Sequence, residues 1–119
     1  MTVLVAVVID CRDAWSLAGF WGEALGRRTR RRWTDAHGTT YVQLDAAVGP
    51  ALLFQAVDEP KGGKNRLHLD IAPTEGRTQD DEVARLVALG AKVLSDEPDL
   101  SWVVLADPEG NEFCVLPPR

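Results

Sequence analysis

The sequence predicts an α+β fold built from two βαβββ modules. Short apolar or alternating runs predict strands, and two longer stretches repeat their apolar residues at helical spacing. Both halves of the chain place these segments in the same order, which is a strand, a helix and three strands. Because a unit this small cannot bury its own helix and sheet completely, the two halves are expected to combine.

Three pairs of short stretches predict that the second half is a repeat of the first. The helix ends Ala24-Leu25-Gly26 and Ala88-Leu89-Gly90 correspond. Two further pairs lie in strands: Tyr41–Asp45 with Trp102–Ala106, and Leu53–Gln55 with Glu112–Cys114.

The chain has 119 residues, which suffices for one domain with a core of its own. We therefore expect a single domain over residues 1–119. Its first module is expected at about 1–59, a turn-rich seam at 60–64 and its second module at about 65–119.

In the first module, Val3–Ile9 is a continuous aliphatic run, which is typical of a central strand covered on both faces. Asp13 is a good N-cap for a helix over Ala14–Leu25, and Gly26 is a good residue to end it. The apolar stripe of this helix consists of Leu17, Phe20, Trp21, Ala24 and Leu25. Trp15 is also interpreted as a packing residue.

The arginine-rich segment Arg27–Trp33 is predicted to be an edge strand, because charged edges discourage pairing between sheets. Binding of an anionic ligand or nucleic acid is the alternative interpretation of this run. Two more strands are expected over Thr40–Asp45 and Ala51–Ala56.

In the second module, Arg66–Ile71 alternates strictly and predicts a half-buried strand. Thr78 is a good N-cap for a second helix whose stripe is Val83, Leu86 and Val87, with Gly90 at its end. Three strands are then expected over 91–94, 101–106 and 111–116, the last two joined by the turn Asp107-Pro108-Glu109-Gly110.

Composition narrows the partners and the compartment. The net charge of −5 argues against nucleic acid as a general partner. No apolar run approaches the roughly 20 residues that span a bilayer, so no membrane partner is expected. The two cysteines, Cys11 and Cys114, do not form a disulfide framework and predict a cytoplasmic protein with reduced thiols, although a single bridge between them stays open.

The strand alternation sorts side chains onto two faces. The face covered by the helices is assigned Val42, Leu44, Leu52, Phe54, Leu67, Leu69, Ile71, Val103, Leu105, Phe113 and Val115. The opposite face mixes aromatic and short polar side chains, which is typical of a ligand cavity. We expect the ligand-binding residues of that cavity to be Tyr41, Gln43, Gln55, Asp70, Trp102 and Cys114, with His68 as the candidate catalytic residue.

Three segments carry a resemblance to a known family. They are Asp13–Gly26, Asn65–Asp70 and Trp102–Val115, the last with Asp-Pro-Glu-Gly-Asn before a final strand. The chain resembles the vicinal oxygen chelate superfamily, which includes glyoxalase I, bleomycin-resistance proteins and extradiol dioxygenases. It is most similar to the small glyoxalase-like members. The resemblance implies two βαβββ modules that form a cupped, mixed sheet around a pocket, and pairing of such chains into homodimers.

In metal-dependent members of that superfamily, four inward residues hold one divalent ion. Their positions correspond here to Ala6, Gln55, His68 and Cys114, with Asp10 as the nearest substitute for the first. Ala6 has no donor atom, and Gln55 is a weak ligand. We therefore expect no cofactor; if an ion such as zinc, iron, nickel or manganese binds, Gln55, His68 and Cys114 are its candidate ligands.

Three functions remain open. The first is a metal-independent pocket that binds an apolar or aromatic small molecule. The second is a metal-dependent lyase or isomerase of the glyoxalase type that uses His68 as acid or base. The third is an interaction module without a small ligand. Metal content and a ligand screen discriminate among them.

Overall fold

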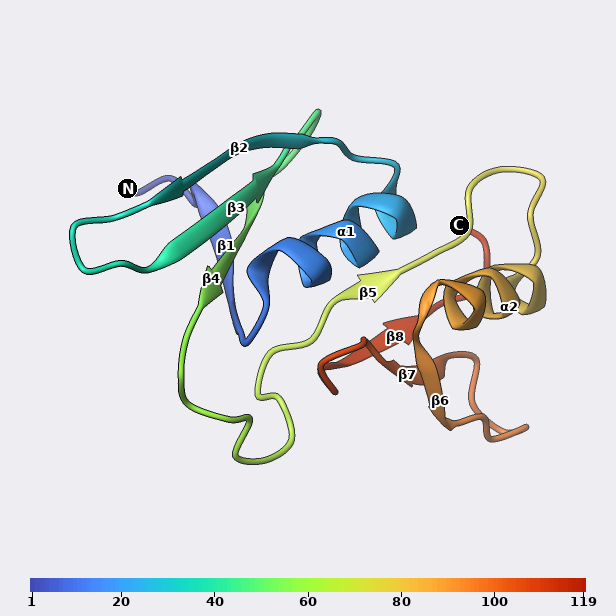
Figure 1. Ribbon diagram of the computed structural model, residues 1–119. Coiled ribbons are helices and arrows are strands. Elements are labelled where there is room, and N and C mark those ends of the chain that lie inside the picture. Colours follow the sequence, from blue (N-terminus) through green and yellow to red (C-terminus); the bar gives the residue numbers. More distant parts are fainter. The chain divides into compact units, whose positions relative to one another are not determined.

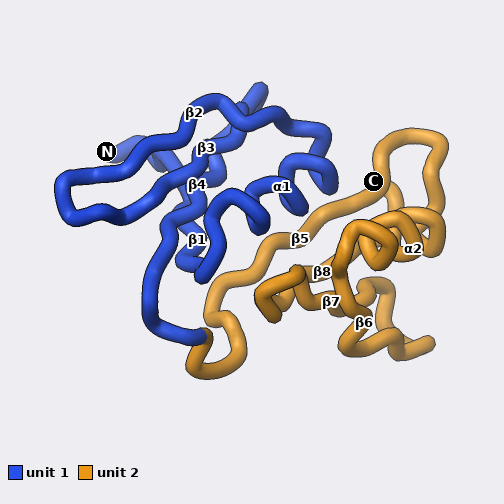
Figure 2. Tube along the Cα trace, in the orientation of Figure 1, with its two compact units in different colours: residues 1–60 blue, residues 61–119 orange.

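A computed structural model describes all of residues 1–119 and divides them into two compact units (Figure 2). Unit 1 is Met1–Pro60 and unit 2 is Lys61–Arg119. Each unit has the element order strand, helix, three strands (Figure 1). Neither helix is long and apolar enough to cross a bilayer.

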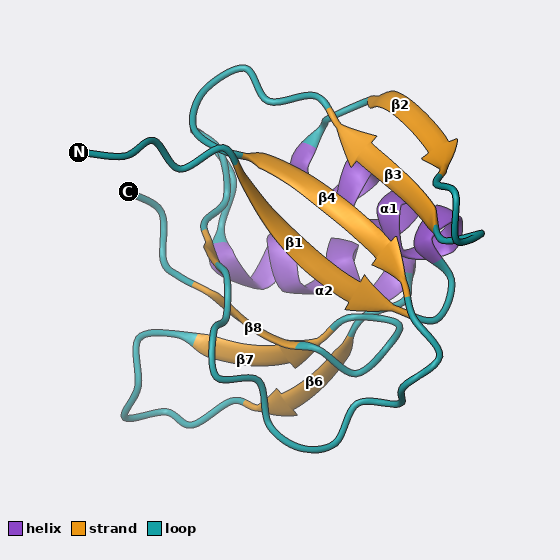
Figure 3. Ribbon diagram, turned by 90° about the vertical axis from the view of Figure 1, so that its left-hand side faces the viewer, coloured by secondary structure: helices purple, strands orange, loops and turns teal.

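Unit 1 is a four-stranded mixed sheet with one helix on one of its faces (Figure 3). Its elements are β1 (Ala6–Cys11), α1 (Ala14–Leu25), β2 (Thr29–Thr34), β3 (Thr40–Leu44) and β4 (Ala51–Ala56). The strand order is β1-β4-β3-β2, in which β1 is parallel to β4 and the other pairs are antiparallel.

Unit 2 repeats this arrangement with shorter strands. Its elements are β5 (Asp70–Ile71), α2 (Gln79–Leu89), β6 (Lys92–Ser95), β7 (Val103–Ala106) and β8 (Glu112–Val115). The order β5-β8-β7-β6 again has one parallel pair, β5 with β8, at one end. The α+β class with two βαβββ modules is therefore confirmed.

The first helix forms where capping and periodicity predict it. The Asp13 carboxylate accepts a hydrogen bond from the Ser16 N–H at 3.0 Å, and Gly26 ends the helix in the left-handed region with φ of 65°. Leu17, Phe20 and Trp21 are buried against the sheet. Trp15 was predicted to pack as well, and this was wrong, because its side chain is 52% exposed.

The second helix has a much smaller buried face. Thr78 caps it by accepting from the Asp81 N–H, as predicted. Leu86 is fully buried, whereas Val87 is 43% exposed, so the predicted apolar stripe is narrower than expected. The second buried residue is Glu82, whose carboxylate accepts a hydrogen bond from Arg85 Nε at 2.9 Å.

The face assignment from strand alternation is confirmed over most of both sheets. Of the residues assigned to the helix-covered face, those in β3, β4, β7 and β8 are all buried: Val42, Leu44, Leu52, Phe54, Val103, Leu105, Phe113 and Val115. Leu67 is the clear exception, since it is 85% exposed and precedes a strand that begins only at Asp70.

The first strand was predicted to be central and covered on both faces, and this was wrong. β1 begins at Ala6 and lies at the end of its sheet with β4 as its one neighbour. Val3, Leu4 and Val5 precede it and are all exposed. Apolar composition indicates a strand but does not determine its rank in the sheet.

The hairpin registers correct one of the predicted correspondences between the halves. Gln55 lies opposite Tyr41, whereas Cys114 lies opposite Val104. If Gln55 corresponds to Cys114, then Tyr41 corresponds to Val104 and not to Trp102. The two predicted strand alignments are thus out of step by two residues.

Candidate functional site

The turn before β8 is built around one buried carboxylate. Asp107 Oδ1 accepts hydrogen bonds from the N–H groups of Glu109 at 2.9 Å and Asn111 at 3.0 Å, and the Asn111 side-chain amide donates to both oxygens. Gly110 has φ of 86°, which favours glycine. The Asp-Pro-Glu-Gly-Asn motif therefore fixes the hairpin that carries Glu112 and Cys114.

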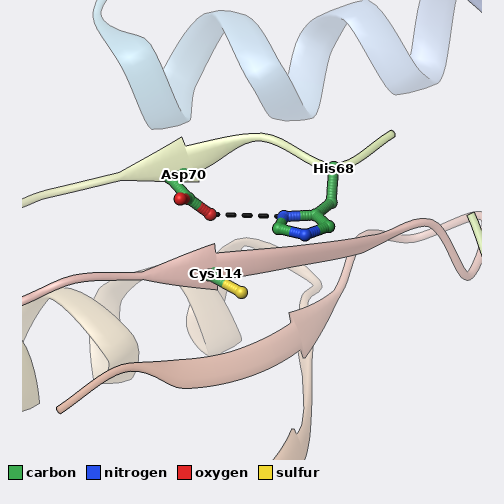
Figure 4. Close-up of side chains that lie close together, drawn as sticks. All are labelled: His68, Asp70 and Cys114. Carbon is green, nitrogen blue, oxygen red and sulfur yellow. Dashed lines mark ion pairs between the residues drawn. The ribbon is translucent and has the colours of Figure 1, made fainter. Parts of the chain in front are cut away.

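The parallel pairing of β5 with β8 brings three donor side chains together. Asp70 lies beside Cys114 in the register, and the Cys114 N–H donates to the Leu69 carbonyl at 2.9 Å. His68 precedes β5 by two residues and lies on the same side as Asp70 (Figure 4). The ligand atoms of His68, Asp70 and Cys114 all lie within 4.8 Å of one another.

His68 and Asp70 form an ion pair or hydrogen bond, with 3.2 Å between His68 Nδ1 and Asp70 Oδ1 (Figure 4). Both side chains are about half exposed, at 45% and 50%. The contact orients the imidazole and leaves Nε2 as its second polar atom. Exposure on this scale allows an external molecule to reach both groups.

Cys114 is a buried thiol that is free of any disulfide. Burial raises its pKa, and the neighbouring Asp70 carboxylate raises it further, whereas Lys64 acts in the opposite direction. At neutral pH the group is therefore a thiol and not a reactive thiolate, unless a cation offsets the charge of Asp70.

Glu112 anchors the segment that leads into the site. Its Oε1 accepts from the Asn65 N–H at 3.0 Å and lies 3.0 Å from Lys61 Nζ. Lys61 also donates to the Gly63 carbonyl. The Asn65 N–H, followed by Lys61, lowers the pKa of Glu112 to about 2, so the carboxylate stays ionised and holds residues 61–65 on β8.

These side chains surround a hollow of about 410 Å³ in unit 2. Its lining residues are Lys64, His68, Asp70, Trp102, Val104, Glu112, Phe113, Cys114 and Leu116. A concave site with apolar walls and a few convergent polar groups is the usual form of a small-molecule site. The size falls within the range of roughly 300–1,000 Å³ that such sites have.

The structure brings four of the seven predicted site residues together in this hollow, namely His68, Asp70, Trp102 and Cys114. Tyr41, Gln43 and Gln55 lie on the sheet of unit 1, where Tyr41 and Gln55 are direct register partners. That these three residues contact the same ligand stays a prediction.

The sequence analysis did not select five of the lining residues, namely Lys64, Val104, Glu112, Phe113 and Leu116. Glu112 alternates with Phe113 in β8 and therefore shares the face of Cys114. The seam at 60–64 was interpreted only as turn material. The spacing of two residues between Glu112 and Cys114 in β8 was the one sequence signal that Glu112 belongs to the site. Its contact with Lys61 could not be predicted, because it depends on how residues 60–64 fold against β8.

The donor set His68, Asp70 and Cys114 fits a borderline-soft divalent ion better than the predicted ligand set Gln55, His68 and Cys114. Asp70 supplies an anionic oxygen in place of the weak amide of Gln55, next to the His68 nitrogen and the Cys114 sulfur. One nitrogen, one oxygen and one sulfur suit zinc, with water as a further ligand. A hard ion that requires several oxygens fits this set poorly.

The structure thus defines an α+β protein of two βαβββ units, the second of which has a hollow lined by apolar and polar side chains. The chain belongs to the glyoxalase-like domain family, whose model matches residues 6–116. This match confirms the resemblance to the vicinal oxygen chelate superfamily. None of the curated proteins compared with the chain matches it.

Solved structures of that superfamily have the same fold. A glyoxalase/bleomycin resistance protein/dioxygenase family enzyme from Burkholderia phytofirmans is 22% identical, with a TM-score of 0.74, and the match covers 96% of this chain and 97% of that one. The fosfomycin resistance protein FosX from Listeria monocytogenes, complexed with Mn(II) and 1S,2S-dihydroxypropylphosphonic acid, is 13% identical with a TM-score of 0.79, covering 98% and 92%.

Glyoxalase I from Leishmania major is 16% identical, with a TM-score of 0.69 and coverage of 98% of this chain and 87% of that one. At these identities the similarity concerns the fold. The site of this chain is therefore argued from its own residues.

Proposed function

We propose that the hollow of unit 2 binds a small organic molecule with an apolar or aromatic part and a polar group. The observation that supports this is the lining, in which Trp102, Val104 and Leu116 provide apolar surface while His68 and Asp70 provide hydrogen-bonding atoms. Trp102 is 40% exposed, and a ligand that covers it removes apolar area from water.

The polar group of the ligand is expected to hydrogen-bond to His68 Nε2, because Nδ1 is engaged by Asp70. Lys64 and Glu112 line the same hollow with opposite charges. The site therefore favours a molecule of low net charge over a polyanion. Sequestration of such a molecule requires no chemistry from the protein.

A ligand screen tests the proposal. Thermal shift is measured with bleomycin, fosfomycin and a panel of aromatic acids and phenols, and each hit is titrated by calorimetry. Trp102→Ala is expected to weaken a hit about tenfold or more, since a buried aromatic contact is lost. Trp15→Ala, which removes an exposed tryptophan of unit 1, is the matched control and leaves the affinity unchanged. Equal losses in both variants, or no hit at all, would contradict the proposal.

A second candidate function is a metal-dependent lyase or isomerase of the glyoxalase type, and the three donors within 4.8 Å favour it. His68, Asp70 and Cys114 would hold the ion. When bound, such an ion polarises neighbouring oxygens of a substrate and acidifies bound water. In the metal-free protein, His68 would instead act as acid or base, and its contact with Asp70 supports this role by orienting the ring.

Metal analysis separates the two candidates. Protein purified without chelator is assayed for zinc, iron, nickel and manganese, and then loaded with cobalt(II). A stoichiometric ion that is lost in His68→Ala, and a thiolate-to-cobalt absorption band that is lost in Cys114→Ser, would favour the enzyme. Cys11→Ser is the control, because Cys11 donates to the Gln55 carbonyl in unit 1. Absence of any bound ion after loading favours the metal-free pocket.

The same proposal includes the organisation of the chain as one domain that pairs into a cytoplasmic homodimer. Two buried free thiols support a reducing compartment. The exposed Val3, Leu4 and Val5 beside the end strand β1 support a covering partner copy. Sedimentation equilibrium of the full chain and of Val5→Asp tests the pairing, since the dimer is expected to weaken in the variant.

A further inference from the structure

The arginine-rich strand of unit 1 has a feature that the hollow of unit 2 does not involve. Five of the six residues from 27 to 32 are arginine, and most of them belong to β2. β2 is the last strand of its sheet and pairs only with β3, so its other edge has no neighbouring strand in the sheet (Figure 3). Such an edge presents backbone groups to which another extended chain can bond.

Two of these arginines are held in place by aromatic rings. The Arg31 guanidinium lies 4.1 Å from the ring centroid of Trp33, and that of Arg32 lies 4.6 Å from the ring of Trp15. Stacking uses the flat face of a guanidinium and leaves its rim of N–H groups for a carboxylate. Because successive strand residues point to opposite faces, Arg31 and Arg32 flank β2 on both sides.

The support beneath Arg31 is itself fixed. Trp33 stacks on Tyr41 with ring centroids 5.0 Å apart and an interplanar angle of 12°, and the Tyr41 hydroxyl donates to Asp35 at 2.9 Å. That bond lowers the pKa of Asp35, after the larger effect of the Thr39 N–H, and raises that of Tyr41. The aromatic rings therefore serve to position guanidinium groups.

Ion pairs join Lys61 with Glu112, His68 with Asp70, and Arg85 with Glu82, whereas no ion pair is found for the arginines of residues 27–32. These arginines therefore have no acidic partner within the chain, although the net charge of the chain is −5. An external anion can pair with them. The sequence analysis had interpreted the run chiefly as a solvated edge, and the stacking on Trp15 and Trp33 is what changes this interpretation.

We propose that the open edge of β2 binds an extended acidic peptide segment of a partner protein, which adds as a further strand. Two adjacent acidic residues of the added strand point to opposite faces and meet Arg31 on one face and Arg32 on the other. Backbone bonds supply affinity, and the arginines supply selectivity. The same charges exclude pairing of two β2 edges, since arginines would then oppose arginines.

Single-stranded nucleic acid is the competing anion. It is less well matched, because base stacking requires free ring faces, whereas Trp33 already contacts both Tyr41 and Arg31. An extended peptide needs only the edge and the guanidinium rims.

Fluorescence anisotropy with three labelled octapeptides tests the proposal on the full chain. The first is Thr-Val-Thr-Glu-Glu-Thr-Val-Thr, the second has Gln-Gln in place of Glu-Glu, and the third keeps Glu-Glu but carries N-methyl groups at alternate backbone nitrogens. The first peptide is expected to bind about tenfold or more tightly than either of the others, because the second lacks charge and the third lacks strand hydrogen bonds. Equal binding of the first and third peptides, or of the first and second, would overturn strand addition.

Variants assign the effect to β2. Arg31→Gln/Arg32→Gln is expected to abolish the preference for Glu-Glu, and Arg31→Lys/Arg32→Lys to reduce it, since lysine keeps the charge without the planar fork. Arg77→Gln/Lys92→Gln, with the same change in net charge at exposed positions of unit 2, retains the preference. The proposal fails if that control loses as much, or if an oligothymidylate binds more tightly than the acidic peptide. Circular dichroism verifies that each variant is folded.

Discussion

The two units share one strand order but differ in what their helices bury. In unit 1, α1 covers its sheet with the buried side chains of Leu17, Phe20 and Trp21. The rings of Phe20 and Trp21 pack edge to face, with their centroids 5.3 Å apart. In unit 2, α2 contributes Leu86 and the paired Glu82. With the same topology, the helix of unit 1 thus buries an aromatic pair, whereas the helix of unit 2 buries a single aliphatic side chain.

The units also differ in their net charge and in the location of their charged and reactive side chains. Unit 1 has six Arg against seven Asp and Glu, whereas unit 2 has seven Lys and Arg against eleven Asp and Glu. The basic residues of unit 1 gather on an edge strand, while unit 2 places acid, imidazole and thiol in a hollow. Identical topology therefore leaves the exposed residues free to take different roles.

The largest expected effect comes from the aromatic core of unit 1. Trp21→Ala leaves a large cavity beneath α1 and is expected to lower the free energy of unfolding by about 4 kcal/mol. Trp15→Ala is the matched control, since it removes only an exposed ring stacked on Arg32 and should cost about 1 kcal/mol. Chemical denaturation measures both; similar losses would show that α1 does not pack as described.

The aliphatic anchor of unit 2 comes next. Leu86→Ala is expected to cost about 3 kcal/mol, because Leu86 is the one fully buried apolar side chain of α2. Leu89→Ala, on the same helix but 36% exposed, should cost much less. Hydrogen exchange of α2 amides provides a second measurement, and an unchanged exchange rate in Leu86→Ala would refute the anchor.

The two aspartate turns offer a smaller contrast. Asp107→Ala removes the acceptor of three donors at a buried position and should cost about 2 kcal/mol. Asp35→Ala removes a similar set from the β2–β3 turn, where the N–H groups of His37 and Thr39 can bond to water, so its cost is expected to be smaller. Thermal unfolding compares the two, and a larger loss for Asp35→Ala would reverse the assignment.

The smallest effect concerns acid stability. The Asn65 N–H, then Lys61, lowers the pKa of Glu112 from its ordinary value of 4.5 to about 2. The folded state therefore binds fewer protons than the unfolded state in this window, and the stabilisation is complete above about pH 4.5 and lost as the pH falls toward about 2. Denaturation of wild type and Glu112→Gln across this range should show curves that converge at low pH, and parallel curves would contradict the assignment.

Much of the fold was predictable because the apolar residues of a half-buried strand or helix recur in the sequence with the period of that element. Val42, Leu44, Phe54 and Leu105 were assigned to the covered face from alternation alone, and all are buried. Asp13 and Thr78 were predicted as caps because their side chains satisfy N–H groups that the helix leaves free. These are local effects, which require no knowledge of the remaining chain.

The errors share a different cause. Val3–Ile9 has the composition of a central strand, yet strand order places β1 at an end of its sheet. Trp15 lies on the exposed side of an otherwise well-predicted helix. For the candidate site, alternation put His68 and Asp70 on one side, but the third donor depends on the parallel register of β5 with β8, which joins residues 44 positions apart.

By itself the sequence determined where most strands and helices form, most of the side chains that they bury and the residues that turn the chain, because these depend on neighbours within a few positions. Only the tertiary structure decided that the ligand atoms of Cys114, His68 and Asp70 lie within 4.8 Å of one another, that Glu112 holds Lys61, and that Arg31 and Arg32 stack on Trp33 and Trp15. Those contacts join distant segments, and their geometry follows from strand order and register, which hydrophobic periodicity does not encode.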